Sequence, residues 1–196
     1  MKRIRVLSFD PGTANFGFSV VEYKDKGYRL VTCGLLKNPM KMIADHKQLK
    51  KQSILFSKEV KKLLTKNKID SLCIERFQPR GISKSTTIEL VNMMIGMVVR
   101  ILVREYKHIS FSAYMPATWK NSVNKQKDLK ELYKLCGVAP HELDSSLMGV
   151  YHIERTLLQK PKQFLRFPFK KWNNQLAAKS LRNAEKNNRR TVRAKR

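Results

Sequence analysis

The sequence predicts an α/β fold, a mixed five-stranded sheet flanked by helices, and three observations lead to this prediction. Residues 3–10 alternate between two faces, and two further strand-like segments, about 16–23 and 28–36, follow between turn signals. Apolar residues then recur at helical spacing over about 45–67 and 85–106. Short apolar segments at 69–74 and 108–114 follow these helices, so a strand-only pattern gives way to alternating strands and helices.

The first strand is expected over residues 3–10, where Pro11-Gly12 ends it, and the second over about 16–23. The turn Lys24-Asp25-Lys26-Gly27 leads into a third strand over about 28–36. Because the connections are short, these three strands are expected to form an antiparallel meander.

Two shorter helices are expected near the end of the folded region, over about 125–136 and 142–158. The full order is therefore βββαβαβαα. Strand-helix-strand units pair their strands in parallel through right-handed crossovers, so the meander and the crossovers share one mixed sheet. This order is that of the RNase H-like fold.

The chain of 196 residues carries 41 Lys and Arg against 15 Asp and Glu, a net charge of +26. Such an excess is costly in self-repulsion, which a polyanion relieves, so DNA or RNA is the expected partner. The alternatives on charge alone are a ribosome-associated protein and a membrane-surface binder. Residues 159–196 hold 13 Lys and Arg and one acid, giving +12, so we expect a basic, aromatic-containing extension after a domain over residues 1–158.

The sequence also bears on location and redox state. No apolar run approaches the ~20 residues of a membrane span, and the N-terminus reads as a strand rather than a signal peptide. The expectation is a soluble, cytoplasmic protein. Cys33, Cys73 and Cys136 lie far apart, which favours reduced thiols packed in the core over disulfides or a zinc site.

Acidic residues at predicted strand ends suggest a metal site. Asp10 closes the first strand and Glu75 the fourth. If these strands are parallel neighbours, ~4.8 Å apart, both carboxylates emerge at one edge of the sheet and repel unless a cation lies between them. His141 and Asp144 are three residues apart at the start of the last helix and can share a face. The four side chains can hold two Mg²⁺ or Mn²⁺ ions, an arrangement that hydrolyses phosphodiesters.

Each of these residues also has an ordinary structural interpretation. Asp10-Pro11-Gly12 is a common turn, and Glu75 can be a simple strand-end charge. Asp144 can be a helix cap or first-turn acid, and His141 a turn residue. Glu142 fits the helix dipole best and is left out of the site. The ordered combination, in so basic a protein, favours the catalytic interpretation.

Four segments, in order, resemble the motifs of the RuvC-type Holliday junction resolvases and together cover about residues 3–155. They are Asp10-Pro11-Gly12 followed by Asn15-Phe16-Gly17-Phe18, Cys73-Ile74-Glu75-Arg76-Phe77, Tyr114-Met115-Pro116-Ala117-Thr118-Trp119-Lys120, and His141-Glu142-Leu143-Asp144-Ser145-Ser146-Leu147-Met148-Gly149. The basic extension lies outside the resemblance.

The resemblance implies a homodimeric endonuclease, dependent on two Mg²⁺ or Mn²⁺ ions per active site, that resolves four-way DNA junctions by paired phosphodiester hydrolysis. Asp10, Glu75, Asp144 and His141 would form the metal-ligand set. Lys120 would contact phosphate beside them as a further catalytic residue. His141 stands where many members have Asp, so it is either a direct ligand or the group that positions or deprotonates the attacking water. Ser8-Phe9 precedes Asp10 where a glycine is usual.

The resemblance also implies which residues hold DNA: Arg76, Phe77, Arg80, Lys84 and Lys120. In the family, an aromatic residue in this region stacks on an unpaired base, a contact worth ~1–3 kcal/mol. Phe77 can instead be a core residue at a strand end, and Lys120 a solvated surface lysine. The helix over 85–106 would help to form the homodimer, which suits a two-fold substrate.

Two other functions stay open on the sequence. One is a broader nuclease for branched DNA such as flaps, or an RNase H-type hydrolase, because one fold supports many chemistries. The other is a non-catalytic nucleic-acid-binding protein. The intact set of Asp10, Glu75 and Asp144 argues against that second alternative.

Overall fold

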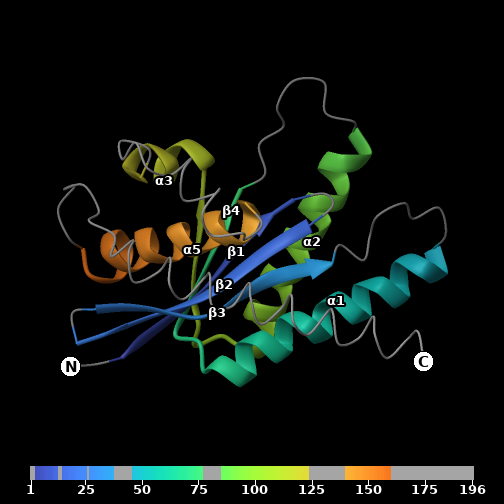
Figure 1. The fold of residues 1–196 in the computed structure, drawn as a ribbon. Coiled ribbons are helices and arrows are strands. Elements are labelled where there is room, and N and C mark those ends of the chain that lie inside the picture. Colours follow the sequence, from blue (N-terminus) through green and yellow to red (C-terminus); the bar gives the residue numbers. More distant parts are fainter. Residues whose placement is uncertain are drawn as a thin grey trace, which may run out of the picture.

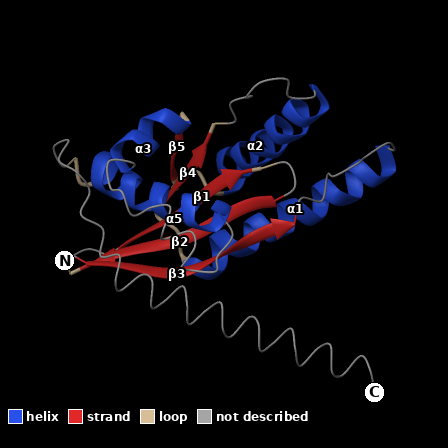
Figure 2. Cartoon of the chain, turned by 45° about the horizontal axis from the view of Figure 1, so that its top comes forward, coloured by secondary structure: helices blue, strands red, loops and turns tan. Residues whose placement is uncertain are grey.

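The structure is a computed structural model that describes residues 3–12, 15–25, 27–37, 46–76, 85–123 and 140–159. Five strands form one sheet in the order β3-β2-β1-β4-β5 (Figures 1 and 2). They are β1 (Ile4–Pro11), β2 (Asn15–Lys24), β3 (Gly27–Lys37), β4 (Ser71–Glu75) and β5 (Ser110–Tyr114). β1 pairs antiparallel with β2, and β2 with β3, whereas β1–β4 and β4–β5 are parallel. The predicted mixed sheet is confirmed, with β1 at its centre.

The described helices are α1 (His46–Asn67), α2 (Ser85–Glu105), α3 (Pro116–Val123) and α5 (Pro140–His152), which continues into the π-helical turn η1 (Ile153–Leu157). The first two confirm the predicted helices. The prediction omitted α3, which follows β5 directly and begins at a proline, a residue whose fixed φ suits the first helical position. The helix predicted over 125–136 lies outside the described residues. The helix predicted over 142–158 instead begins two residues earlier and becomes π-helical at Ile153.

Helices cover both faces of the sheet (Figure 2), so side chains on both faces of its strands are buried. On one face α1 and α2 pack on Leu7 and Phe9 of β1, and Phe16 makes edge-to-face ring contacts with Phe9 and Phe56 at 5.2 and 5.3 Å between centroids. On the other face α5 packs on Val6. The alternation in β1 therefore places each successive side chain under a different helix layer.

Small residues let α5 approach the sheet closely. The Ser8 hydroxyl, on the α5 side of β1, donates to the Ser145 carbonyl of α5 at 2.6 Å and lies 2.8 Å from the Ser19 hydroxyl. A Cβ atom on Gly149 would come within 2.9 Å of Ser8 and of Val21. Ser8 thus forms a direct bond from β1 to α5.

The C-terminal end of α5 is held by a second buried bond network. His152 is 1% exposed, and its ring nitrogens lie 2.6 Å from the Ser71 hydroxyl and 2.7 Å from the Tyr114 hydroxyl. Burial lowers the pKa of His152 to about 4, so the ring is neutral near pH 7. These bonds fasten α5 to β4 and β5.

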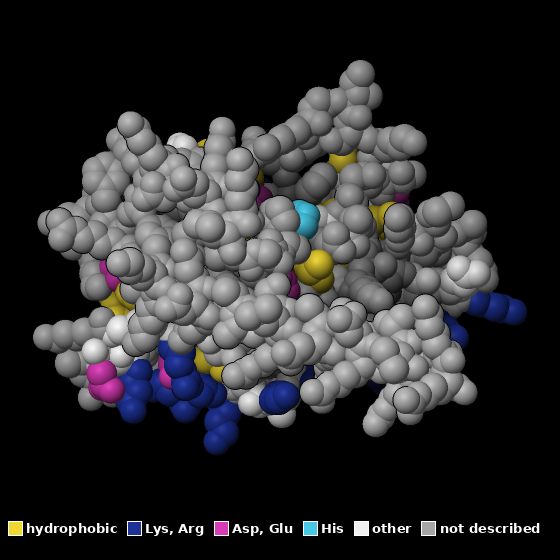
Figure 3. All heavy atoms as spheres, viewed as in Figure 1, with side chains coloured by type: hydrophobic (Ala, Val, Ile, Leu, Met, Phe, Trp, Pro, Cys, Tyr) yellow, Lys and Arg dark blue, Asp and Glu magenta, His cyan; other side chains and the backbone are white. Residues whose placement is uncertain are grey.

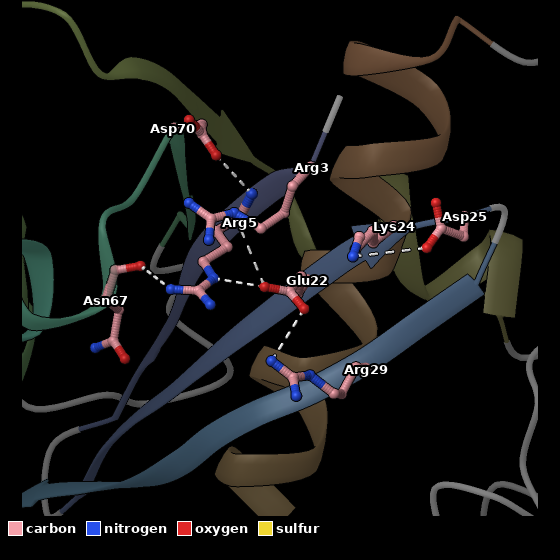
Figure 4. A network of polar contacts seen from close by, with 8 residues as sticks. All are labelled: Arg3, Arg5, Glu22, Lys24, Asp25, Arg29, Asn67 and Asp70. Atoms are coloured by element: carbon pink, nitrogen blue, oxygen red, sulfur yellow. Dashed lines mark hydrogen bonds and ion pairs between the residues drawn. The ribbon is translucent and has the colours of Figure 1, made fainter. Parts of the chain in front are cut away.

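A network of charged side chains lies at the end of the sheet opposite to Asp10 and Glu75 (Figure 4). Glu22 is 6% exposed and accepts Arg5 Nε at 2.7 Å on one oxygen and Arg29 Nη2 at 3.0 Å on the other. Arg5 also donates to the Asn67 carbonyl of α1 at 2.8 Å. The surrounding hollow, about 780 Å³, is lined by both arginines and Arg3. Lys and Arg side chains gather at this side of the molecule in the space-filling view (Figure 3).

Other predictions about the body of the protein concern cysteines and membranes. Cys33 and Cys73 are buried thiols in the core, as predicted, and Cys136 lies outside the described residues. None of the helices in the described ranges is long and apolar enough to cross a membrane.

Candidate active site

The strand-end acids lie on the α5 side of the sheet. The parallel register of β1 and β4 pairs Phe9 with Ile74, and Asp10 and Glu75 are the next residue in each strand. The pleat puts Asp10 on the same face as Ser8, and Glu75 on the same face as Cys73, which belongs to the core under α5. The two predicted carboxylates therefore emerge side by side at the C-terminal edge of the parallel strands.

The first turn of α5 lies over these two strand ends (Figure 1). His141 Nδ1 is 2.6 Å from Asp10 Oδ2. Gly17, paired with Asp10 across β1 and β2, makes this approach possible, since a Cβ there would fall 2.6 Å from the His141 carbonyl carbon. The hydrogen bond to Asp10 raises the pKa of His141 above its usual range, against the opposing effect of burial. Because a carboxylate oxygen accepts, Nδ1 is the donor in this pair, and Nε2 is the ring nitrogen that Asp10 does not engage.

The third element at the site is α3, which contributes two consecutive residues. Lys120 Nζ lies 3.1 Å from Asp144 Oδ2 and 3.5 Å from Glu75 Oε2. The indole N–H of Trp119 donates to the same Glu75 oxygen at 2.7 Å. Lys120 therefore bridges two of the three carboxylates, and Trp119 holds one of them from the protein interior.

The site brings the carboxyl groups of Asp10, Glu75 and Asp144 close enough to affect one another's charge. Burial raises the pKa of Glu75 to about 7, and the nearby charge of Asp10 adds to this, whereas Lys120 and Trp119 act in the opposite direction. Burial alone would lower the pKa of Lys120, but the carboxylates of Asp144 and Glu75 outweigh it and raise that pKa. An additional cation would relieve this repulsion.

The donor chemistry suits a hard divalent cation, because three carboxylates supply oxygen ligands and His141 a nitrogen. Within the described ranges, no three His, Cys, Asp or Glu side chains are gathered closely enough to hold an ion as they stand. The acids are paired with other side chains of the protein instead: Asp10 with His141, and Glu75 and Asp144 with Lys120. The residues fit a metal site in which a bound ion relieves Glu75 and Asp144 of their pairing with Lys120.

The structure brings together all five side chains predicted to be catalytic: Asp10, Glu75, His141, Asp144 and Lys120. Of the predicted DNA-binding set, Lys120 lies within the site and Arg76 is exposed beside it, with its backbone N–H donating to the Tyr114 carbonyl at 2.7 Å. Phe77, Arg80 and Lys84 lie outside the described residues. Sequence reasoning did not assign Trp119 or Gly17 to the site, although both stand inside the motifs.

Comparison with known proteins places the chain in a family. The family model for crossover junction endodeoxyribonuclease RuvC matches residues 6–130. The RuvC protein of Aliarcobacter butzleri is 29% identical over 124 residues, which cover 61% of this chain and 71% of that protein.

Solved structures show the same fold. Thermus thermophilus RuvC superposes with a TM-score of 0.62 at 18% identity, covering 80% of this chain and 98% of its own. The same protein in complex with a Holliday junction substrate gives a TM-score of 0.61 at 16% identity, covering 79% and 96%. The RNase H-like fold predicted from the element order is thereby confirmed. By the match over residues 6–130, this chain belongs to the RuvC family of crossover junction endodeoxyribonucleases.

Proposed function

We propose that this chain resolves four-way DNA junctions by metal-dependent hydrolysis of one phosphodiester in each of two strands. The observation that carries the proposal is the meeting of Asp10, Glu75 and Asp144, from β1, β4 and α5, with His141 and Lys120 beside them. Thermus thermophilus RuvC, which shares the fold, has been solved with a Holliday junction substrate, and this supports the choice of DNA substrate.

The three carboxylates and His141 would hold two Mg²⁺ or Mn²⁺ ions. Such ions, when bound, stabilise charge that develops on a phosphate and make water a better nucleophile. Glu75 and Asp144 must then give up their pairing with Lys120. Lys120, no longer needed by Glu75 and Asp144, would carry its positive charge to the scissile phosphate.

His141 has a geometry that supports a role in moving a proton. Asp10 orients the ring through its hydrogen bond with Nδ1, as a carboxylate often does for a catalytic imidazole. Nε2 would then exchange the proton with water or substrate. The alternative role is that of a ligand. The variants His141→Asp and His141→Ala separate the two roles, since Mn²⁺ should rescue the carboxylate better if the residue is a ligand.

A four-way junction needs two symmetric cuts, so we propose a homodimer acting in the cytoplasm of a bacterium or a phage-infected cell. Helix α2 supports this arrangement, because Val103 near its C-terminal end is 63% exposed and Met93 and Met97 are only partly buried.

The proposal is tested by the variants Asp10→Asn, Glu75→Gln and Asp144→Asn, which keep shape and remove charge. Each should lose Mg²⁺-dependent cleavage while binding the junction as well as the parent or better. Asp70→Asn is the matched control, since Asp70 is an exposed acid just before the N-terminal end of β4, and it should cut normally. Substantial cutting by all three site variants would refute the mechanism.

The substrate is tested separately with a four-way junction, a fork, a plain duplex and an RNA–DNA hybrid. Preference for the four-way junction is expected at equal concentration and salt. Equal or faster cutting of the fork or the hybrid would assign the site to a broader branched-DNA nuclease or an RNase H-type hydrolase.

A further inference from the structure

Trp119 is a buried side chain in direct contact with the candidate site. It is 1% exposed and packs in the core under α5 with Val6, Leu143 and Leu147. An indole has a single hydrogen-bond donor, and this one goes to Glu75 Oε2 at 2.7 Å. A backbone carbonyl would be enough to satisfy the N–H of a tryptophan that only packs in the core. Here the acceptor is a carboxylate of the candidate metal site.

Trp119 also contacts the cation of the site. Lys120 Nζ lies 5.0 Å from the centroid of the Trp119 ring, within the range of a cation–π interaction. The same nitrogen lies 3.5 Å from Glu75 Oε2, the oxygen that receives the indole N–H. One rigid, buried ring therefore touches the carboxylate with its edge and the ammonium group with its face.

We propose that Trp119 is a positioning residue for Glu75: its N–H holds Oε2 in place, so that Oε1 is the oxygen presented to the cation. The ring face keeps Lys120 beside the site when an ion binds at Glu75. This inference rests on the proposed function, because it concerns how Glu75 would serve as a ligand. Outer-shell partners of this kind typically contribute 10–100-fold to metal affinity or activity.

The test removes the N–H and keeps the ring. The chain has two tryptophans, so a Trp172→Phe parent leaves Trp119 as the single indole. In that parent, replacement of Trp119 by 3-benzothienylalanine puts sulfur where the N–H was at nearly the same volume, and Trp119→Phe is a second N–H-free variant. We expect Mn²⁺ affinity, measured by calorimetry without DNA, and single-turnover cleavage to fall by about 10–100-fold. Junction affinity should stay within about twofold of the parent, because the lost bond does not reach DNA.

A spectroscopic signature separates positioning from packing. The parent has a single indole ¹H–¹⁵N resonance, and it should shift when Mg²⁺ is added in place of paramagnetic Mn²⁺. The Glu75→Gln substitution should shift it as well, since the ion and the substitution each alter the acceptor of the indole N–H. Val6→Ala, which leaves a cavity in the same core, is the packing control and should keep metal affinity and cleavage.

The outcomes distinguish the inference from the proposed function. If Asp10→Asn, Glu75→Gln and Asp144→Asn all retain cleavage, the proposed function itself fails. If Glu75→Gln loses Mn²⁺ affinity and cleavage while the benzothienyl protein matches its parent, only the role of Trp119 is overturned. A loss in Val6→Ala as large as that in the benzothienyl protein would also overturn it, because packing alone would explain the effect.

Discussion

Gly17→Ala should damage the site although it adds only one methyl group. Gly17 lies opposite Asp10 in the β1–β2 register, and the first turn of α5 lies directly above it. The new Cβ would stand 2.6 Å from the His141 carbonyl carbon and 2.7 Å from the His141 Cβ. Ordinary carbon contacts begin at ~3.5 Å, so the first turn of α5 must retreat by about 0.9 Å.

Two magnitudes follow from that displacement. Overpacking against backbone atoms that cannot rotate away should lower the free energy of unfolding by about 1–3 kcal/mol. The displaced turn carries His141 away from Asp10 and Asp144 away from Lys120, and a shift of ~1 Å in catalytic geometry can cost ~10²-fold in rate. Cleavage should therefore fall more than the loss of folded protein explains.

The assay is single-turnover junction cleavage at a temperature where urea unfolding shows the variant to be folded. Gly27→Ala is the matched control: at that position, where β3 begins, the nearest described atom to a new Cβ is the Lys24 carbonyl oxygen at 3.5 Å, an ordinary contact. It should leave cleavage unchanged and change the free energy of unfolding by no more than ~1 kcal/mol. A Gly17→Ala protein with parental stability and cleavage would refute the claim that this glycine seats α5.

Three further predictions concern charge. Lys120→Met should tighten Mn²⁺ binding without DNA by about tenfold, because it removes an internal competitor, and should still slow cleavage; calorimetry showing weaker binding would contradict this. Burial raises the pKa of Glu22, but its arginine partners outweigh this effect and hold that pKa below 4.5. The ion pairs of Glu22 therefore stabilise the fold above pH 4.5, and this contribution is lost as the pH falls through the lowered pKa. Glu22→Gln should therefore lower the free energy of unfolding by about 2 kcal/mol at pH 7 and by less at pH 3, measured by urea unfolding, and an equal cost at both would exclude the linkage. Ending the chain at Gln159 should make the salt dependence of junction affinity shallower, by ~0.9 in log–log slope per phosphate lost, with cutting retained at low salt and saturating enzyme. An unchanged slope would mean that residues 160–196 do not touch DNA.

The sequence was sufficient to place the strand-end acids. Alternation fixes which face a strand residue takes, and parallel pairing fixes which edge it reaches, so Asp10 and Glu75 could be brought together from pattern alone. The start of α5 could also be located, since His141 and Asp144 precede an apolar helical stretch.

The pairings inside the site could not be predicted, because they depend on α3. Its eight residues contain too few apolar positions to show a helical period, and its proline start was the only local signal. Without α3 in place, nothing in the sequence connects Trp119 with Glu75 or Lys120 with Asp144. The role of Gly17 was hidden for a similar reason, since its close neighbour, His141, is 124 residues away in the chain.

The attachment of α5 to the sheet has a consequence for kinetics. The helix is bonded to the sheet at its start through His141, in its middle through Ser145, and at its end through His152. Three bonds spaced along one face oppose both sliding and tilting of α5 on the sheet. Exchange of the internal cations for a metal ion must then proceed by rotation of side chains such as Lys120, which takes picoseconds to nanoseconds, rather than by helix movement over microseconds to milliseconds. In stopped-flow mixing, metal uptake should therefore be a single phase whose rate rises linearly with ion concentration.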